Sequence, residues 1–180
     1  MGTETKALYY VAWVIQGEWA HKIQSLKEYA CTHFDTCKAL RSPAHVTIIP
    51  PFKIKNTELP DLCNKILLWS QKIPYFIWKV NGVSHFDNRV IYVDVESAES
   101  IDIYRNNLFE MLKYQRPSGS YHPHITLAFR DLSPEAFAPA WNYFSQLDLQ
   151  GEILQKTVSL LRHNGQRWEI IESFNHSGGR

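Results

Sequence analysis

Hydrophobic residues recur along this chain with two different periods, and each period predicts a different kind of element. Runs rich in β-branched and aromatic residues predict strands, because such side chains suit a pleated, half-buried surface. Apolar residues three and four positions apart predict helices with one buried face. On these patterns the strands are expected at residues 8–15, 44–49, 75–83, 89–95, 125–129, 152–162 and 167–174. The helices are expected at residues 18–30, 57–71, 100–114 and 133–146.

The order of these elements, β-α-β-α-β-β-α-β-α-β-β, predicts an α+β fold, because strands and helices are mixed along the chain. A strand–helix–strand unit occurs twice, at residues 8–49 and 89–129. A length of 180 residues suits one compact domain or two tightly joined lobes. We therefore interpret the repeat as two related lobes within one domain of residues 1–180.

Turn-forming residues set the expected element boundaries. Pro50-Pro51 is expected to end the strand at 44–49, since proline cannot donate to a ladder. Ser133 followed by Pro134 is a strong helix start. Asn164-Gly165 predicts a hairpin turn between the last two strands. Residues Asn175 to Arg180 are expected to form a frayed tail.

Composition narrows the function classes. Hydrophobic residues make up 44% of the chain, which is enough for a packed core. The formal net charge is only +1, so the protein does not coat long nucleic acid by bulk charge, and anion recognition must come from local clustering. No apolar run approaches the length of a transmembrane helix, so we expect no membrane partner.

The cysteine count predicts a reducing compartment. Cys31, Cys37 and Cys63 are odd in number, and the polar segment Met1 to Lys6 leads directly into a strand rather than forming a secretory leader. We therefore expect free thiols and a cytoplasmic protein.

Two short motifs carry the candidate chemistry: His45-Val46-Thr47 and His124-Ile125-Thr126. Each lies in a strand-like run, where side chains two positions apart point to the same face. Each strand therefore offers one imidazole and one hydroxyl side by side, while the intervening aliphatic residue points into the core. With eight His and eight Thr in the chain, about 0.4 such triplets are expected by chance, against the two found.

Two such strands facing one cleft suit the opening of a cyclic phosphate. The reaction needs a base for the attacking water and an acid for the leaving ribose oxygen, and histidine serves both roles near neutral pH. Threonine hydroxyls can donate to the phosphate oxygens. This arrangement requires neither a metal nor a cofactor.

The charge pattern around both motifs favours an anion site. Residues 37–57 contain four basic residues and no acid, and residues 111–130 contain three basic residues and no acid. Buried strands alone would explain the missing acids but not the basic residues in the flanking loops. These basic residues are Lys38, Arg41, Lys53, Lys55, Lys113, Arg116 and Arg130.

The segments HVTIIPPF, at residues 45–52, and YHPHITLAFRDL, at residues 121–132, resemble the two-histidine phosphoesterase superfamily. They are most similar to its branch of 2′-5′ RNA ligase-like and 2′,3′-cyclic phosphodiesterase proteins. The resemblance implies two pseudo-symmetric antiparallel-sheet lobes with outer helices around a central cleft. It also implies metal-independent hydrolysis of 2′,3′-cyclic phosphates on RNA ends or cyclic nucleotides, to 2′-phosphates. We further expect a monomer.

By this resemblance His45 and His124 are the catalytic residues, and Thr47 and Thr126 bind the phosphate. As a working assignment, His45 assists the leaving oxygen and His124 activates water, although the sequence leaves the split open. Arg130, directly after the second motif strand, is a further candidate for phosphate binding, with a solvated strand end as its alternative role.

Two aromatic residues are candidates for substrate binding. Phe52 follows the first motif and can stack on a base or simply pack beside the prolines. Tyr121 lies in the loop that enters the second motif and can line the cleft. The neighbouring His122 is expected to be exposed and non-catalytic.

Three alternative interpretations stay open. The first is a metal site, with Cys31, His33, Cys37, His122 and His124 as candidate ligands, although their spacing fits no common zinc module. The same fold can serve an RNA-end binding protein or a 2′-5′ RNA ligase. Finally, both motif histidines can be hydrogen-bonded core residues, which would leave the charge pattern unexplained.

Overall fold

The computed structural model describes residues 5–97 and 100–178 of the chain. Its strands are β1 (Lys6–Val14), β2 (His45–Lys55), β3 (Phe76–Phe86), β4 (Val90–Glu96), β5 (His124–Phe129), β6 (Gln150–Gln155), β7 (Thr157–His163) and β8 (Trp168–Asn175). Its α-helices are α1 (Gly17–Phe34), α2 (Leu59–Ser70), α3 (Ile101–Leu112) and α4 (Pro134–Phe144). Two short 3₁₀ turns, η1 (Lys38–Arg41) and η2 (Asn56–Glu58), flank β2.

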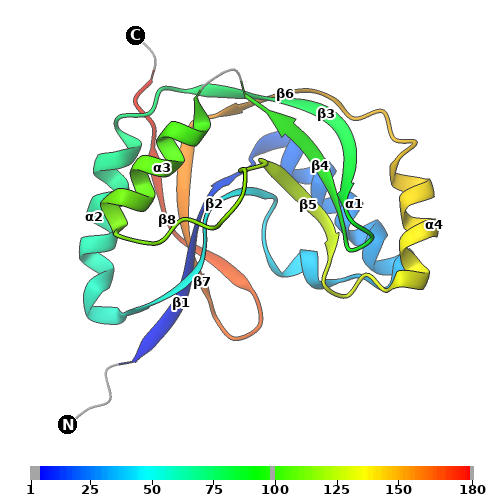
Figure 1. Ribbon diagram of the computed structural model, residues 1–180, viewed down its shortest axis with the longest axis horizontal. Helices are drawn as coiled ribbons and strands as arrows, with labels where there is room; N and C mark the ends of the chain where they lie inside the picture. Colours follow the sequence, from blue (N-terminus) through cyan, green and yellow to red (C-terminus); the bar gives the residue numbers. More distant parts are fainter. Residues whose placement is uncertain (1–4, 98–99, 179–180) are drawn as a thin grey trace.

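In the described part of the chain, eight strands form one curled antiparallel sheet in the order β6-β3-β4-β5-β2-β1-β7-β8. Helices α2 and α3 pack beside the half that contains β1, β2, β7 and β8, and α1 and α4 pack beside the other half (Figure 1). The two halves meet where β2 pairs with β5, through the residue pair Val46 and Ile125. The α+β fold with two antiparallel lobes and outer helices is thus confirmed, with the two lobes sharing one sheet.

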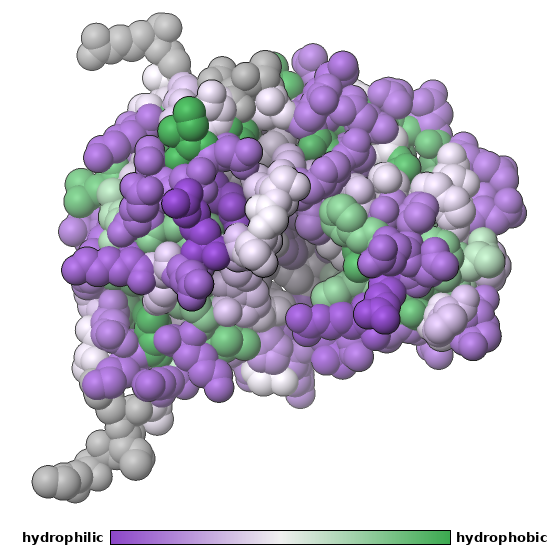
Figure 2. Space-filling view, in the orientation of Figure 1, coloured by the Kyte–Doolittle hydropathy of each residue, from purple (hydrophilic) through white to green (hydrophobic). Residues whose placement is uncertain are grey.

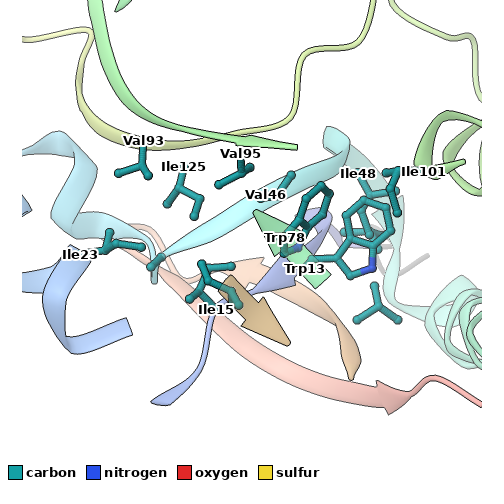
Figure 3. Packing of buried hydrophobic residues seen from close by; sticks show 14 of the residues in the cluster. Trp13, Ile15, Ile23, Val46, Ile48, Trp78, Val93, Val95, Ile101 and Ile125 are labelled. Carbon is teal, nitrogen blue, oxygen red and sulfur yellow. The ribbon is translucent and has the colours of Figure 1, made fainter. Parts of the chain in front are cut away.

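The buried core continues across this junction. Val46 and Ile125 are both fully buried, and Figure 3 shows them beside Val93 and Val95. Trp13 from one half packs edge-on against Trp78 from the other, with ring centroids 5.5 Å apart. The relative position of the two motif strands is therefore fixed by close-packed apolar side chains, in which even small changes of volume are costly.

The predicted strand at 152–162 is wrong, because the structure divides it into two. Strand β6 pairs with β3 at one edge of the sheet, whereas β7 pairs with β1 in the other half. Lys156 separates the two strands. The buried Gln155 side chain donates to the carbonyl of Thr157 at 2.6 Å, which satisfies a backbone group at the crossing.

The prediction that Pro50-Pro51 ends the first motif strand is also wrong, since β2 continues to Lys55. Beyond Val46 this strand has β1 as its neighbour on one side only. Its register against β1 passes from Val11–Ile49 to Tyr9–Phe52, so the prolines form a bulge. A bulge at an unpaired edge tolerates residues that lack an N–H donor.

The expectation of three free thiols is wrong for one pair, because Cys31 and Cys37 form a disulfide and Cys63 is free. Helix α1 ends at Phe34, and the left-handed φ of 53° at the following residue, Asp35, turns the chain back and brings the two cysteines together. With this disulfide, the cysteines no longer support a cytoplasmic location, which stays a prediction. Within the described residues, no helix is both long and apolar enough to cross a membrane.

The C-terminal segment is not a frayed tail over Asn175 to Ser177. Asn175 ends β8, His176 is 3% exposed, and Ser177 donates from its backbone N–H to the carbonyl of Ile73 at 2.9 Å. A buried imidazole therefore anchors this segment. Residues 179 and 180 lie outside the described residues.

Candidate active site

Strands β2 and β5 bring the two motifs to one place. Val46 and Ile125 lie directly opposite each other and point into the core, so the residues on either side of them point to the opposite face of the sheet. All four motif side chains line one cavity of about 560 Å³. These are His45, Thr47, His124 and Thr126. The space-filling surface is hollowed near its centre, between the two halves (Figure 2).

The ring orientation of His45 follows from one hydrogen bond. Its Nδ1 lies 2.7 Å from the carbonyl oxygen of Pro43. A carbonyl oxygen can only accept, so Nδ1 carries the proton and donates it. The neutral ring therefore has its lone pair on Nε2, which has no hydrogen-bond partner among the described residues.

His124 is held in the same way. Its Nδ1 donates to the carbonyl oxygen of His122 at 2.8 Å, and its Nε2 likewise has no partner in the described part of the chain. Behind it, Nε2 of His122 lies 2.9 Å from the carboxylate of Asp94. The ring of Phe86 contacts that of His124 edge-on, with centroids 5.0 Å apart. Both motif histidines thus share one tautomer, fixed by the carbonyl two residues earlier.

Burial and charge act unequally on the two rings. Burial, with smaller effects of the Lys27 cation and His124, lowers the pKa of His45 to about 4, although the bond to Pro43 opposes this shift. Burial also lowers the pKa of His124, but the His122 carbonyl and the Asp94 carboxylate raise it. Without a bound anion, both rings are therefore neutral near pH 7, and His124 accepts a proton more readily.

The two motif hydroxyls are free to bind a ligand. Neither Thr47 nor Thr126 hydrogen-bonds through its hydroxyl to another described residue, although each side chain is half-buried on the cavity wall. A hydroxyl can donate one hydrogen bond, so the pair offers two donors beside two imidazoles.

The cavity wall is basic. Four cationic side chains line it, and no Asp or Glu does so among the described residues. Three of them, Lys38, Arg41 and Arg130, belong to the seven basic residues that the sequence marks out, whereas the four others do not line this cavity. The fourth cation is Lys27 of α1. This distribution attracts anions although the whole chain is nearly neutral.

Arg130 lies exposed at the mouth of the cavity, where its left-handed φ of 63° ends β5. The next residue, Asp131, accepts hydrogen bonds from the hydroxyl of Thr36 and the backbone N–H groups of Cys37 and Lys38, all at 2.9 Å. This carboxylate ties the end of β5 to the start of η1. It thereby fixes the positions of two basic segments relative to each other.

The structure separates the two aromatic candidates. Tyr121 donates to the carbonyl of Thr47 at 2.7 Å and lines a second cavity, of about 500 Å³. That cavity shares Thr47, Phe86 and His124 with the first, so the two adjoin each other. Phe52 instead packs on Tyr9 and Tyr114 and lines neither cavity, as its packing alternative predicts.

Several cavity residues were missed by sequence reasoning. Lys27 left a readable signal, since it falls between Ile23 and Ala30 on the apolar face of its helix, where a lysine is unexpected. The others left none, because they reach the cavity only through sheet curvature. They are Tyr10, Ser42, Phe86, His163 and Trp168.

The candidate ligands of the alternative metal site have other partners in the structure. Cys31 and Cys37 are bonded to each other, and Nδ1 of His33 bonds the carbonyl of Tyr29. His122 contacts Asp94, as an exposed histidine outside the main cavity. Among the described residues, no three His, Cys, Asp or Glu side chains gather as a metal site would need.

Comparisons with known proteins concern the family and the fold of the chain. A family profile described as the 2′-5′ RNA ligase superfamily matches residues 16–167. A protein of Staphylococcus aureus (strain Newman), provisionally named a phosphoesterase, is 29% identical over 142 residues, which cover 74% of this chain and 81% of that protein.

Solved structures share the fold. Escherichia coli LigT, solved in complex with 3′-AMP, has a TM-score of 0.66 and 13% identity, covering 96% of this chain and 99% of LigT. TT0787 of Thermus thermophilus has a TM-score of 0.64 and 17% identity, covering 96% of this chain and all of that one. At such identities the likeness concerns the fold alone.

Proposed function

This chain belongs to the 2′-5′ RNA ligase superfamily, and from that premise we propose that it is a metal-independent phosphodiesterase that hydrolyses 2′,3′-cyclic phosphates of RNA ends or nucleotides. Family membership and the relatives named as phosphoesterases support phosphoesterase activity. The cyclic substrate is the finer part of the proposal and depends on the chemistry of the cavity.

One observation carries the proposal. Two imidazoles with free Nε2 atoms and two unbonded hydroxyls line the same basic cavity. Opening a cyclic phosphodiester needs a proton acceptor for water and a proton donor for the departing oxygen, about one phosphate apart. The cavity offers both groups from rigid central strands, so little reorganisation is needed at the moment of reaction.

In the proposed reaction, water attacks phosphorus while one Nε2 takes its proton. The bond from phosphorus to one ribose oxygen breaks, and the second Nε2–H protonates that oxygen. The hydroxyls of Thr47 and Thr126 donate to the phosphate oxygens as negative charge builds there, and Arg130 adds a cation at the mouth. The product is a phosphomonoester, proposed as the 2′-phosphate.

The charges around the two rings favour the reverse of our sequence-based working assignment. The base must be neutral before the reaction, and burial together with the Lys27 cation keeps His45 neutral. The acid must carry a proton, and Asp94 favours the protonated form of His124. We therefore assign water activation to His45 and protonation of the leaving oxygen to His124.

The nucleoside is proposed to occupy the second cavity. It adjoins His124 and is lined by Tyr121 and by Phe86, whose ring can stack on a base. A solved neighbour is described in complex with 3′-AMP, which supports a nucleotide-sized ligand for this fold. Phe52 is not part of this proposal, since it packs elsewhere.

The test is turnover in the presence of a chelator. Purified protein is incubated with 2′,3′-cyclic mononucleotides and with an RNA oligomer that ends in a 2′,3′-cyclic phosphate, and products are compared with 2′- and 3′-phosphate standards. We expect hydrolysis that survives the chelator and disappears in His45→Ala and His124→Ala. Activity that requires an added divalent metal would contradict the proposal.

The same samples decide between the remaining functions of this fold. Binding without turnover on every such substrate would identify an RNA-end binding protein. Joining of the cyclic end to an added RNA with a 5′-hydroxyl would identify a 2′-5′ RNA ligase, since that reaction runs the same proton transfers in reverse.

A further inference from the structure

Lys27 is a buried lysine whose charge is not balanced by a carboxylate in the described part of the chain. Its side chain lies in the middle of α1 and is only 2% exposed, whereas Lys22 on the same helix is exposed. Lysine is almost never fully buried unless it is paired. No Asp or Glu forms an ion pair with it among the described residues.

The hydrogen bonds of Lys27 are also incomplete. Its Nζ donates to the carbonyl oxygen of Ser42 at 3.1 Å, and this is its only hydrogen bond to a described residue. An ammonium group has three N–H donors, so two are left without protein partners. Burying an ammonium in this state is costly unless a ligand completes its shell.

The position of Lys27 shows where that ligand would lie. The side chain lines the same cavity as both motifs, and its charge acts directly on His45. Burial lowers the pKa of Lys27 to about 8, so most of the ammonium persists at neutral pH. The bond to Ser42 alone would not need a charge, because a neutral donor could make it.

We propose that Lys27 is a phosphate-binding residue of this cavity, whose ammonium donates to a non-bridging oxygen of the bound phosphate. The inference rests on the proposed function for the identity of the substrate. It adds that the site carries an internal cation suited to the second negative charge, which develops in the transition state and stays on the phosphomonoester product. The product should therefore bind more tightly than the cyclic substrate.

Inorganic phosphate is the probe, since its binding requires no turnover. Calorimetric titrations between pH 6.5 and 9.5 compare wild type with Lys27→Met, which keeps length and bulk but has no charge or donor, and with Lys22→Met as the matched control. We expect Lys27→Met to bind phosphate roughly tenfold or more weakly at pH 7, and Lys22→Met to match wild type. Equal affinity of Lys27→Met and wild type would overturn the proposal.

The ratio of the two affinities gives the sharper readout. Ionisation of phosphate itself cancels in the ratio of wild type to Lys27→Met. That ratio should fall as the pH rises through about 8, where the ammonium loses its proton. A merely structural lysine would give a ratio independent of pH.

Other charged and titratable groups facing Lys27 must be considered in this profile. Those that share its cavity are Tyr10, Lys38, Arg41, His45, His124, Arg130 and His163. From the packed helix α4 the charged residue is Glu135, which is exposed. All of them are present in both proteins, so they too largely cancel.

A measurement on wild type alone covers the case in which Lys27→Met does not fold. With lysine labelled at ¹³Cε, the pKa of Lys27 is followed by NMR without phosphate and at saturation. Direct contact with the anion should raise that pKa by about one unit or more. An unchanged pKa would refute the contact even in an active enzyme, whereas a raised pKa in a protein without cyclic phosphodiesterase activity would refute only the proposed function.

Discussion

Three buried or half-buried histidines in this molecule share a lowered pKa, yet they differ in what surrounds the second ring nitrogen. In the cavity, His45 and His124 each donate through Nδ1 to a carbonyl and leave Nε2 free. At the C-terminal anchor, Nδ1 of His176 contacts the carbonyl of Ser70, and its Nε2 accepts from the indole of Trp13 at 3.1 Å. Both nitrogens of that ring are therefore occupied.

This contrast shows which observation identifies the site. Burial lowers the pKa of His176 to about 4, as it does for His45, so a shifted pKa alone does not mark a catalytic histidine. What distinguishes the cavity is a free Nε2 beside unbonded hydroxyls and several cations. The anchor instead joins the buried indole of Trp13 on β1 to the end of α2 at Ser70, which is a structural role.

The largest expected effect is on turnover. Replacing His45 or His124 by alanine should lower kcat roughly a hundredfold or more, because each supplies a proton transfer. His176→Ala should keep the kcat of the folded protein, since the anchor lies outside the cavity. Comparable losses of kcat in all three variants, measured on folded samples, would remove the distinction between the two regions.

The second effect is on stability, and it should be confined to the anchor. His176→Ala leaves the indole N–H of Trp13 buried without a partner, which should cost roughly 2 kcal/mol of unfolding free energy. Guanidinium unfolding at pH 7 measures this value. The control is Thr126→Val, which replaces a cavity residue by one of similar shape. It should change the unfolding free energy by much less.

The anchor also makes a pH prediction. The folded pKa of His176 is about 4, below the unfolded value of about 6.5, so the unfolded state binds more protons between these limits. The contribution of His176 is complete above pH 6.5 and declines by up to about 3 kcal/mol as the pH falls to 4. Unfolding of His176→Gln should depend less steeply on pH in this window than unfolding of wild type. Parallel curves would show that His176 titrates normally.

A smaller effect is expected from the hydroxyls. Thr47→Val and Thr126→Val should each lower kcat about tenfold while substrate affinity changes less, because the hydroxyls donate most strongly as charge builds on phosphate. Thr47→Ser should restore most of the activity, since it keeps the donor. If the valine variants retain full kcat, the hydroxyls do not contact the reacting phosphate.

The smallest effect separates the two catalytic rings. Asp94→Asn removes the carboxylate that favours protonated His124, so the alkaline limb of the profile of kcat/KM against pH should move to lower pH. The acid limb, assigned to His45, should stay in place. Movement of the acid limb instead would reverse the roles of the two histidines.

The sequence predicted the α+β fold and its paired lobes, because the strand and helix periods are strong in most elements. It could not divide residues 150–163 into β6 and β7, since aliphatic residues occur on both sides of the junction and only Lys156 separates the two strands. It also misjudged Pro50-Pro51, because the tolerance of β2 for proline depends on which of its edges is paired.

The site was predictable where it follows from strand alternation. Because side chains alternate along a strand, the pleat alone puts His45 and Thr47 on one face of the sheet, and it does the same for His124 and Thr126. Phe86 joins them only through the curl of the sheet, which no local pattern encodes, whereas Lys27 left one local sign in its place on the apolar face of α1. The disulfide between Cys31 and Cys37 depends likewise on the turn at Asp35.

The central claim is that both motif imidazoles serve one phosphate. Its most direct test is an NMR titration of the ¹⁵N-labelled histidine rings with inorganic phosphate. We expect Nε2 of His45 and Nε2 of His124 to respond together with one shared dissociation constant, while His176 does not respond. A response of only one cavity ring, or two different dissociation constants, would contradict it.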